Sequence, residues 1–405
     1  MFKAERTTGR SAHGEGIYVL QARPPLPLTS VWQPGAVAGI VASANNAMPP
    51  APTAMAPLLP GLDLWDMWPV QLADGTTARF GGDVLWMVLS APRLADPDLR
   101  HNIARIRLLR ETAAGWHDCG NLLPDGLNPG GREWAGSALY DPATARLTLF
   151  YTVAGLPDEA RPSFAQRLFQ TSGRLEWAQG EPRVAAWSAP HENIVADGID
   201  YVVVNQAEGV PGLIKGFRDP AHFRDPATGA TVVVFTGSLA QSTSRWNGCI
   251  GLARATDAAL ENWQLHPPLI SADALCNEQE RPHLIWREGC YYLFWSSQRR
   301  VFAPDGPSGP NGLYGMVAEA LEGPYRPLNG TGLVAANPAA APFQTYSWWV
   351  DADLVVHGFL DLAAVGPDGV VDSEDWRRAH FGGVPAPRFA IALDGERAWV
   401  DNPAR

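Results

Sequence analysis

A turn signal leads directly into a strand in the stretch Asp141-Pro142-Ala143-Thr144-Ala145-Arg146-Leu147-Thr148-Leu149-Phe150-Tyr151-Thr152-Val153. Asp-Pro-Ala-Thr favours a tight turn, and the residues that follow it are mainly β-branched or aromatic. The same tetrapeptide recurs at 225–228, just before another such run, Thr231 to Phe235. Both stretches therefore predict a hairpin of antiparallel strands. Further short runs of this kind are Val84 to Leu89, Arg105 to Leu109, Tyr291 to Trp295 and Phe389 to Leu393.

The order of these runs predicts an all-β fold. No amphipathic helix of 10–15 residues alternates with them, which argues against a parallel βαβ sheet. Many short antiparallel strands fit a closed architecture such as a β-propeller, which leaves few exposed edges, although no exact internal repeat supports this. We expect residues 61–405 to form a single propeller domain. Residues 1–60 are rich in Pro and Ala, and we expect an extended arm around that domain, partly disordered at its beginning.

Composition excludes several functions. The formal net charge of −11 argues against a nucleic-acid partner, and the chain has no apolar run long enough to span a membrane. Residues 1–10 lack the pattern of a secretory signal. The nine His residues show no metal-binding spacing, so we expect neither a metal nor another cofactor. Four Cys are too few for a disulfide scaffold; Cys249 and Cys276 could form one disulfide or remain free thiols.

Four clusters combine carboxylates with Arg or aromatic residues. The distances along the chain from Asp66 to Glu133, to Asp219 and to Glu280 are 67, 86 and 61 residues. This spacing is about that of one four-stranded blade if the propeller has five blades, so the acids can converge on a central channel. The clusters are Trp65-Asp66-Met67-Trp68-Pro69, Arg132-Glu133-Trp134, Phe217-Arg218-Asp219-Pro220 and Glu278-Gln279-Glu280-Arg281-Pro282-His283.

Each cluster has a structural reading beside the chemical one. Asp66 could be a surface residue at a turn with both Trp residues in the core, or a carboxylate beside aromatics on which a sugar stacks. Retaining cleavage of a glycosidic bond requires an ionised carboxylate and a protonated one. Adjacent acids beside an Arg, as at 278–281, can have different pKa values, because one acid pairs with the Arg and stays ionised while burial and like charge raise the pKa of the other. Asp225, in a second Arg-Asp-Pro, is interpreted as a turn residue, and His283 as a core group rather than a ligand.

Taken together, the motifs resemble glycoside hydrolase family 68, the bacterial levansucrases, inulosucrases and β-fructofuranosidases. The resemblance runs from about Ser30 to Val400. Six motifs follow one another in the same order: Leu64 to Pro69, Glu133 to Gly136, Phe217 to Pro220, Glu280 to His283, Gly323 to Gly330 and Gln344 to Ser347.

The resemblance implies a five-bladed β-propeller with a funnel-shaped central active site that acts on sucrose and fructosyl acceptors without a metal. It implies that Asp66 is the nucleophile, Asp219 the transition-state stabiliser and Glu280 the acid/base. The positions that it assigns to substrate binding are Trp65, Trp134, Ala135, Arg218, Glu278, Arg281, Gln298 and Tyr346. Family members act outside the cytoplasm or in the periplasm, which implies the same location here.

Three positions depart from the family pattern. Ala135 stands where the family usually has a Ser that hydrogen-bonds the nucleophile, so Asp66 is expected to be less well oriented. Gln298 stands where a His or Arg helps to hold the acceptor sugar, with Arg299 and Arg300 beside it, and Trp348 replaces another His. We therefore predict fructosyl transfer from sucrose to fructan, oligosaccharide or water, with a mainly hydrolytic β-fructofuranosidase as the alternative. A non-catalytic sugar-binding propeller is a remoter alternative.

Overall fold

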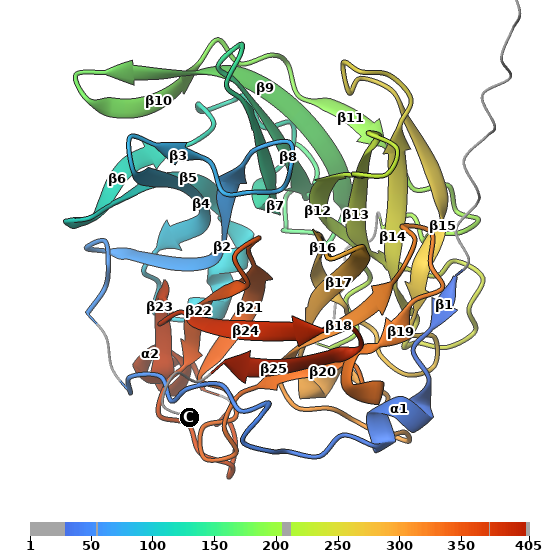
Figure 1. Ribbon diagram of the computed structural model, residues 1–405. Coiled ribbons are helices and arrows are strands. Elements are labelled where there is room, and N and C mark those ends of the chain that lie inside the picture. Colours follow the sequence, from blue (N-terminus) through green and yellow to red (C-terminus); the bar gives the residue numbers. More distant parts are fainter. Residues whose placement is uncertain (1–28, 54–55, 205–211, 372, 402–405) are drawn as a thin grey trace, which may run out of the picture.

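The structure, a computed structural model, describes residues 29–53, 56–204, 212–371 and 373–401. Antiparallel sheets surround a central axis, as Figure 1 shows. The strands of the first half are β1 (Ser30–Val31), β2 (Leu62–Gln71), β3 (Arg79–Phe80), β4 (Asp83–Pro92), β5 (Arg105–Thr112), β6 (Gly115–Asn121), β7 (Arg132–Asp141), β8 (Arg146–Ala154), β9 (Gln166–Ala178), β10 (Glu181–Ala185), β11 (His191–Ile194) and β12 (Phe217–Arg224).

The remaining strands are β13 (Thr231–Ser238), β14 (Gly248–Ala255), β15 (Trp263–Ser271), β16 (Glu280–Arg287), β17 (Cys290–Ser297), β18 (Gly312–Ala318), β19 (Arg326–Pro327), β20 (Leu333–Ala336), β21 (Thr345–Val350), β22 (Val355–Leu362), β23 (Phe381–Pro385), β24 (Phe389–Asp394) and β25 (Arg397–Asp401). Helices are short: α1 (Pro34–Ala38), α2 (Glu374–His380) and the 3₁₀ turns η1 (Pro97–Asn102), η2 (Arg299–Val301) and η3 (Leu328–Gly330).

Within the described residues, the hydrogen bonds between strands define four sheets. The largest runs β10-β9-β8-β7-β2-β4-β5-β6, and within it β2 and β7 are joined only by a short parallel contact, Val70 with Ala138 and Gln71 with Leu139. The other three sheets run β1-β15-β14-β13-β12, β16-β17-β18-β19 with β20 on β18, and β21-β22-β24-β25 with β23 on β22. The strand predictions are confirmed, including the two hairpins at Asp-Pro-Ala-Thr, which join β7 to β8 and β12 to β13.

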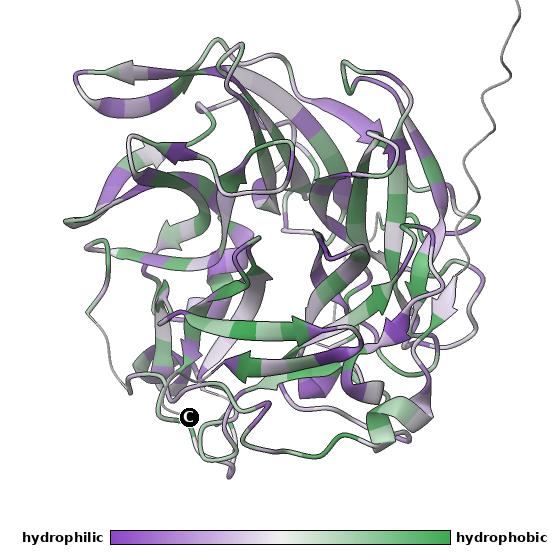
Figure 2. Ribbon diagram, in the orientation of Figure 1, coloured by the Kyte–Doolittle hydropathy of each residue, from purple (hydrophilic) through white to green (hydrophobic). Residues whose placement is uncertain are grey.

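The sheets pack against one another through strands that are apolar on both faces. Seven of the eight residues of β13 are buried, and this strand is green along most of its length in Figure 2. Such a strand reads as a continuous hydrophobic run because neighbouring layers cover both of its faces. The ring is therefore held mainly by burial of apolar side chains between sheets.

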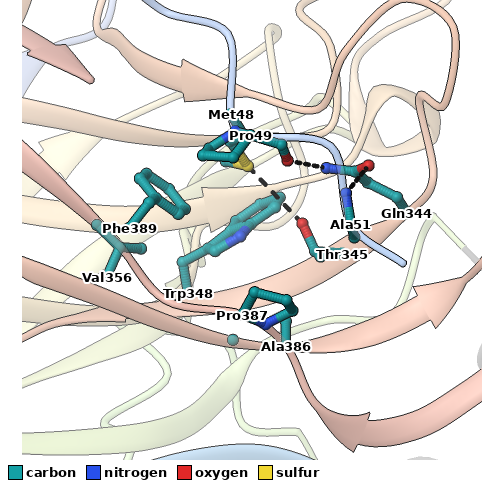
Figure 3. Close-up of a pocket in the computed structure, with 11 residues that line it drawn as sticks. Met48, Pro49, Ala51, Gln344, Thr345, Trp348, Val356, Ala386, Pro387 and Phe389 are labelled. Carbon is teal, nitrogen blue, oxygen red and sulfur yellow. Dashed lines mark hydrogen bonds between the residues drawn. The ribbon is translucent and has the colours of Figure 1, made fainter. Parts of the chain in front are cut away.

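Residues 29–53, called the strap below, cross the outside of the sheets formed by the second half of the chain (Figure 1, blue). β1 pairs in parallel with β15, Ala47 bridges to Ala336, and the backbone nitrogen of Val400 donates to the oxygen of Asn45 at 2.7 Å. Near the end of the strap, the side-chain amide of Gln344 bonds Pro49 and Ala51, both at 2.9 Å (Figure 3). The strap thus ties three sheets together before the chain enters β2.

The structure also bears on the predictions for the N-terminal arm, the cysteines and membrane-spanning segments. The beginning of the expected arm, residues 1–28, lies outside the described residues. Cys249 and Cys276 are both buried free thiols rather than a disulfide. No helix in the described ranges is long and apolar enough to cross a membrane.

Candidate active site

The candidate residues lie where the innermost strands break their pairing register. Residues at these breaks adopt the left-handed backbone region: φ is 38° at Asp66, 59° at Asp219, 51° at Arg281 and 60° at Ser347. Residues other than glycine rarely occupy this region, and bulges of this kind redirect side chains beside active sites. The breaks fall between Trp65 and Met67 in β2, Trp134 and Gly136 in β7, Arg218 and Ala221 in β12, Glu280 and His283 in β16, and Tyr346 and Trp349 in β21.

Asp66 is half-buried among charged neighbours that come from other strands. Burial raises the pKa of its carboxyl, while the nearby guanidinium of Arg281 lowers it. A hydrogen bond from the side chain of Ser347 also lowers this pKa, and the negative charge of Glu280 raises it. The structure therefore places Asp66 close to Glu280 and to Arg281 of β16.

Asp219 is buried at the start of β12, with 7% of its surface exposed. Its Oδ2 accepts from the backbone nitrogen of Arg281 at 3.2 Å and from the hydroxyl of Thr236 at 3.1 Å. Burial raises the pKa of Asp219 to about 6, although the guanidinium of Arg218 opposes this. The negative charges of Glu280 and Asp66 raise it further, which brings the three expected catalytic carboxyls into one electrostatic cluster.

Glu280 is held from two sides. Nη2 of Arg218 donates to Oε1 of Glu280 at 2.9 Å, and the hydroxyl of Tyr346 donates to Oε2. The same Nη2 donates to Oε2 of Glu278 at 2.7 Å. Burial raises the pKa of Glu278 to about 6, with Arg218 opposing and Glu280 reinforcing the rise. Two glutamates thus share one guanidinium group.

Arg281 lies beneath the site, with 3% of its surface exposed. Its Nη1 donates to the backbone oxygen and the hydroxyl of Ser347 at 3.0 and 2.9 Å. Its Nη2 donates to the backbone oxygen of Met67 at 2.6 Å, and its guanidinium lies over the rings of Trp68 and Trp349, at 5.7 and 5.6 Å from their centres. Arg281 therefore joins β2, β16 and β21 directly behind the carboxyl cluster.

Two of the aromatic candidates, Trp65 and Trp134, contact residues of η1. Trp65 is 1% exposed, and its indole nitrogen has no hydrogen-bond partner among the described residues. Arg100 of η1 lies over the ring of Trp65 at 5.3 Å. Trp134 is half-buried and donates to the backbone oxygen of His101 at 3.1 Å. Trp68 is fully buried, in agreement with the core alternative for that residue.

Ala135 is buried, and its backbone oxygen accepts from the hydroxyl of Thr152 at 3.1 Å. Thr152 in turn accepts from the backbone nitrogen of Asp219 at 2.9 Å. Glu133, two residues earlier in β7, bonds residues of β5 rather than the carboxyl cluster. It accepts from the side chain of Arg105 at 2.6 Å and from the backbone nitrogen of Ile106 at 2.7 Å. Glu133 thus braces β7 against β5.

The expected acceptor-side residues lie at the start of η2 and on β21. Gln298 is half-buried and precedes η2, where its backbone oxygen accepts from Val301. Two residues later, the charge of the exposed Arg300 adds to that of Arg218 in lowering the pKa of Glu278, and to that of Arg100 in lowering the pKa of Asp361. Trp348 is 1% exposed and lines the pocket beneath the strap in Figure 3, so this departure affects packing there.

Sequence reasoning missed several neighbours of the cluster. Asp361 at the end of β22 has its pKa raised to about 6 by burial, against the charges of Arg100 and Arg300. Burial and the charge of Arg100 hold the pKa of His101 well below its usual range. No motif marked these residues. Ser347, in contrast, belongs to the Gln344–Ser347 motif, which named its position without its hydrogen bond to Arg281.

Two structural interpretations are confirmed. Asp225 is a turn residue that accepts from the backbone of Ala227 and the hydroxyl of Thr228. His283 is a core group, 2% exposed, whose Nε2 accepts from the backbone nitrogen of Val350 at 2.9 Å. Across the described ranges, no three His, Cys, Asp or Glu side chains are grouped so that they could hold a metal ion.

Clustered carboxyls that share an Arg, with tryptophans nearby in the chain, are the groups that acid–base and covalent cleavage of a glycosidic bond requires. The family profile described as Levansucrase/Invertase matches residues 35–247 and 240–404. The chain belongs to this levansucrase/invertase family, glycoside hydrolase family 68.

Relatives and solved structures agree with this membership. A levansucrase of Pseudomonas syringae pv. actinidiae is 31% identical over 379 residues, covering 84% of this chain and 83% of the relative. A levansucrase of Zymomonas mobilis is 32% identical over 369 residues, covering 83% and 82%. The inulosucrase from Halalkalicoccus jeotgali bound to kestose has a TM-score of 0.84 and 35% identity, covering 92% of this chain and 95% of that one. The levansucrase of Gluconacetobacter diazotrophicus has a TM-score of 0.79 and 25% identity, covering 96% and 92%.

Proposed function

We propose that this protein is a retaining fructosyltransferase that takes the fructosyl unit from sucrose, releases glucose and passes the fructosyl unit to a fructan, an oligosaccharide or water. The observation that carries the proposal is the convergence of Asp66, Asp219 and Glu280 from three separate inner strands. The family membership and the names of the relatives, levansucrase and inulosucrase, support the substrate.

Each carboxyl has one role in this reaction. Asp66 attacks the anomeric carbon of the fructosyl unit, and the bond from that carbon to the glucosyl oxygen breaks. Glu280 gives its proton to the departing oxygen and then takes a proton from the acceptor hydroxyl, which attacks the fructosyl-enzyme. Asp219 accepts hydrogen bonds from fructosyl hydroxyls while positive charge develops on the ring.

The surrounding contacts support these roles. Arg218 and Tyr346 each donate to one oxygen of Glu280, so the carboxyl group is held in one orientation. Glu278, whose pKa burial raises to about 6, shares that guanidinium and bonds sugar hydroxyls at the same place. We assign Trp65 and Trp134 to the walls of the sugar site, Gln298 to its acceptor side, and Ala135 to the floor beside the nucleophile. Arg281 acts from below, through the backbone and Ser347.

We further propose that the sheets form five blades of one propeller, which is the catalytic domain, with the strap wrapped around it. The support is the short parallel contact in the largest sheet, which divides it into β2-β4-β5-β6 and β7-β8-β9-β10. Each of the inner strands β2, β7, β12, β16 and β21 then begins one blade with the same break in register. An extracellular or periplasmic site of action rests on the family resemblance alone.

Incubation of the protein with sucrose tests the activity. Release of glucose in excess of free fructose supports transfer, and equal release of both would assign the mainly hydrolytic alternative instead. The replacement of an expected acceptor-side cation by Gln298 is the observation that favours hydrolysis. If neither sugar is released, the protein is a non-catalytic sugar-binding propeller and the proposed function is wrong.

A further inference from the structure

The 3₁₀ turn η1 contacts both of the tryptophans that we assign to the sugar site. The backbone oxygen of His101 accepts from the indole nitrogen of Trp134 at 3.1 Å, and the ring of His101 meets the ring of Trp65 edge-on with their centres 5.6 Å apart. The guanidinium of Arg100 also lies over Trp65. Because Trp65 belongs to β2 and Trp134 to β7, the position of η1 sets how the two rings lie relative to each other.

η1 lies outside the sheets and is held by the helix α2. Asp96 caps η1, since its Oδ1 accepts from the backbone nitrogen of Asp98 at 3.0 Å. The same carboxylate accepts two bonds from Arg377 of α2: Oδ1 from Nε at 3.0 Å and Oδ2 from Nη2 at 2.6 Å. An Arg–carboxylate pair with two bonds fixes direction as well as distance. Asp96 is 8% exposed, so water competes little for this pair.

The next residue of α2 is tied to the strand that carries the expected nucleophile. Nη1 and Nη2 of Arg378 donate to Oδ2 and Oδ1 of Asp63, at 2.6 and 3.1 Å. Asp63 is fully buried on β2, three residues before Asp66. Successive side chains of a helix point about 100° apart, so Arg377 and Arg378 reach different parts of the protein. α2, which lies beside β23 in Figure 1, therefore joins η1 to β2.

Phe381 adds a second contact between η1 and this part of the chain. It follows α2 directly, at the start of β23, and the guanidinium of Arg100 lies 4.2 Å from the centre of its ring. Arg100 is 6% exposed and contacts the rings of both Phe381 and Trp65. The segment of α2 and β23 thus supports η1 at its cap and at the residue that touches the sugar-site tryptophan.

We infer that Arg377 is a positioning residue for substrate binding: through Asp96 it holds η1 against Trp65 and Trp134, and so sets the shape of the sugar site beside them. This inference rests on the proposed function, which assigns both tryptophans to the walls of that site. A buried ion pair adds little net stability compared with apolar residues of the same size. Its loss is therefore expected to show mainly in how sucrose binds.

The test compares Arg377→Gln, Asp96→Asn and the double variant with Arg254→Gln. Asn at position 96 keeps an oxygen that can accept from the backbone nitrogen of Asp98, so η1 keeps its cap. Arg254 of β14 is also largely buried and pairs with Glu322 at 2.6 Å, so its variant removes an ion pair of the same kind elsewhere in the ring. Initial rates of glucose release give kcat and KM for sucrose, and the thermal unfolding temperature of each variant is measured.

Arg377→Gln and Asp96→Asn are each expected to raise the KM for sucrose about tenfold, with a smaller fall in kcat, because η1 and the walls that it supports are displaced. The double variant is expected to match the single variants, since the same pair is lost in each. Arg254→Gln is expected to lower the unfolding temperature and to leave KM unchanged.

An unchanged KM in folded Arg377→Gln or folded Asp96→Asn would overturn the inference, whatever the unfolding temperature. Effects on KM that multiply in the double variant would also overturn it, because the two residues would then act separately. A wild-type protein that releases no glucose overturns the proposed function itself.

Discussion

Nη2 of Arg218 lies 2.9 Å from Oε1 of Glu280, so a buried guanidinium holds the expected acid/base in place. Charge-assisted hydrogen bonds of this kind are stronger than neutral ones and fix orientation. Arg218 belongs to β12 and Glu280 to β16, and the contact therefore also fixes the distance between two inner strands. The position of Glu280, the expected proton donor, is therefore coupled to that of Asp219, the expected transition-state stabiliser next to Arg218 in β12.

Substitution of the two reacting carboxyls separates their roles. Glu280→Gln is expected to lower kcat/KM on sucrose by about 10²- to 10⁴-fold, because the departing glucose then receives no proton. On β-fructosyl fluoride, whose leaving group needs no proton, this variant is expected to retain a first-turnover burst of fluoride release, followed by slow turnover because the acceptor hydroxyl lacks its base. Asp66→Asn is expected to be inactive on both substrates, since no nucleophile remains. Absence of that burst in Glu280→Gln would assign the residue a different role.

Arg281→Lys tests the link behind the site. A Lys ammonium cannot reach Met67 and both oxygens of Ser347 at once, so buried acceptors are left without a partner. We expect the free energy of unfolding to fall by about 2–4 kcal/mol, with a loss of sucrose cleavage. Arg287→Lys is the matched control on β16, because Arg287 is exposed and pairs only with Glu288 among the described residues. Denaturant titration of both variants checks the difference.

Asp219→Asn tests the cost of the buried charge. The pKa of Asp219 is raised from 3.8 to about 6, so its ionised form destabilises the fold, and the wild type loses stability as pH rises through about 6. The Asn variant avoids this loss. It is expected to be more stable than wild type by about 2–3 kcal/mol at pH 7.5, and equally stable below pH 4. Chemical unfolding at several pH values measures the difference.

Asp141 serves as a control, because its pKa is shifted in the opposite direction to that of Asp219. Hydrogen bonds from Thr144 and from the backbone of Ala143 lower the pKa of Asp141. Asp141 therefore contributes stability that is present above its ordinary pKa and lost as pH falls through the lowered one. Asp141→Asn is expected to destabilise the protein at neutral pH and to have no effect in strong acid. The two variants are compared by the difference of their unfolding free energy from wild type. If that difference changes with pH in the same direction for Asp219→Asn and Asp141→Asn, one of the two pKa shifts has the wrong sign.

Trp32→Ala tests the strap. Trp32 is fully buried against Trp295, Phe302 and Tyr314, and its indole donates to the backbone oxygen of Thr331 at 3.0 Å. Truncation leaves a large cavity and is expected to lower the free energy of unfolding by about 3–5 kcal/mol. Trp286→Ala is the control, because Trp286 is 47% exposed and its loss is expected to have little effect. If Trp32→Ala lowers the free energy of unfolding as little as Trp286→Ala does, the strap does not stabilise the ring.

The sequence predicted the strands well because their apolar runs and turns are local signals. The runs at 147–153 and 231–235 became β8 and β13, and both Asp-Pro-Ala-Thr segments became the turns before them. The motifs also named Asp66, Asp219 and Glu280, which the structure brings together. Strands, turns and short motifs can all be recognised from residues that are adjacent in the sequence.

The direction of individual side chains could not be predicted in the same way. Side chains in a regular strand alternate between its faces, but the breaks at Asp66, Arg281 and Ser347 interrupt that alternation. Sequence spacing therefore could not show that Arg281 points behind the cluster or that it hydrogen-bonds Ser347 and Met67. The contributions of Arg100 and Asp361 come from a 3₁₀ turn and a strand end, and depend only on how the sheets close around the axis.

The strap has a consequence for the order in which the protein is made. Its pairing partners, Ile270, Ala336 and Val400, lie about 240 to 355 residues further along the chain. Translation begins at the amino end, so the strap leaves the ribosome first and its final partners leave last. Loop closures of this length are slow. The strap therefore cannot finish docking until nearly all of the chain has emerged, because its contact with Val400 comes last, and completion of the ring is a late event.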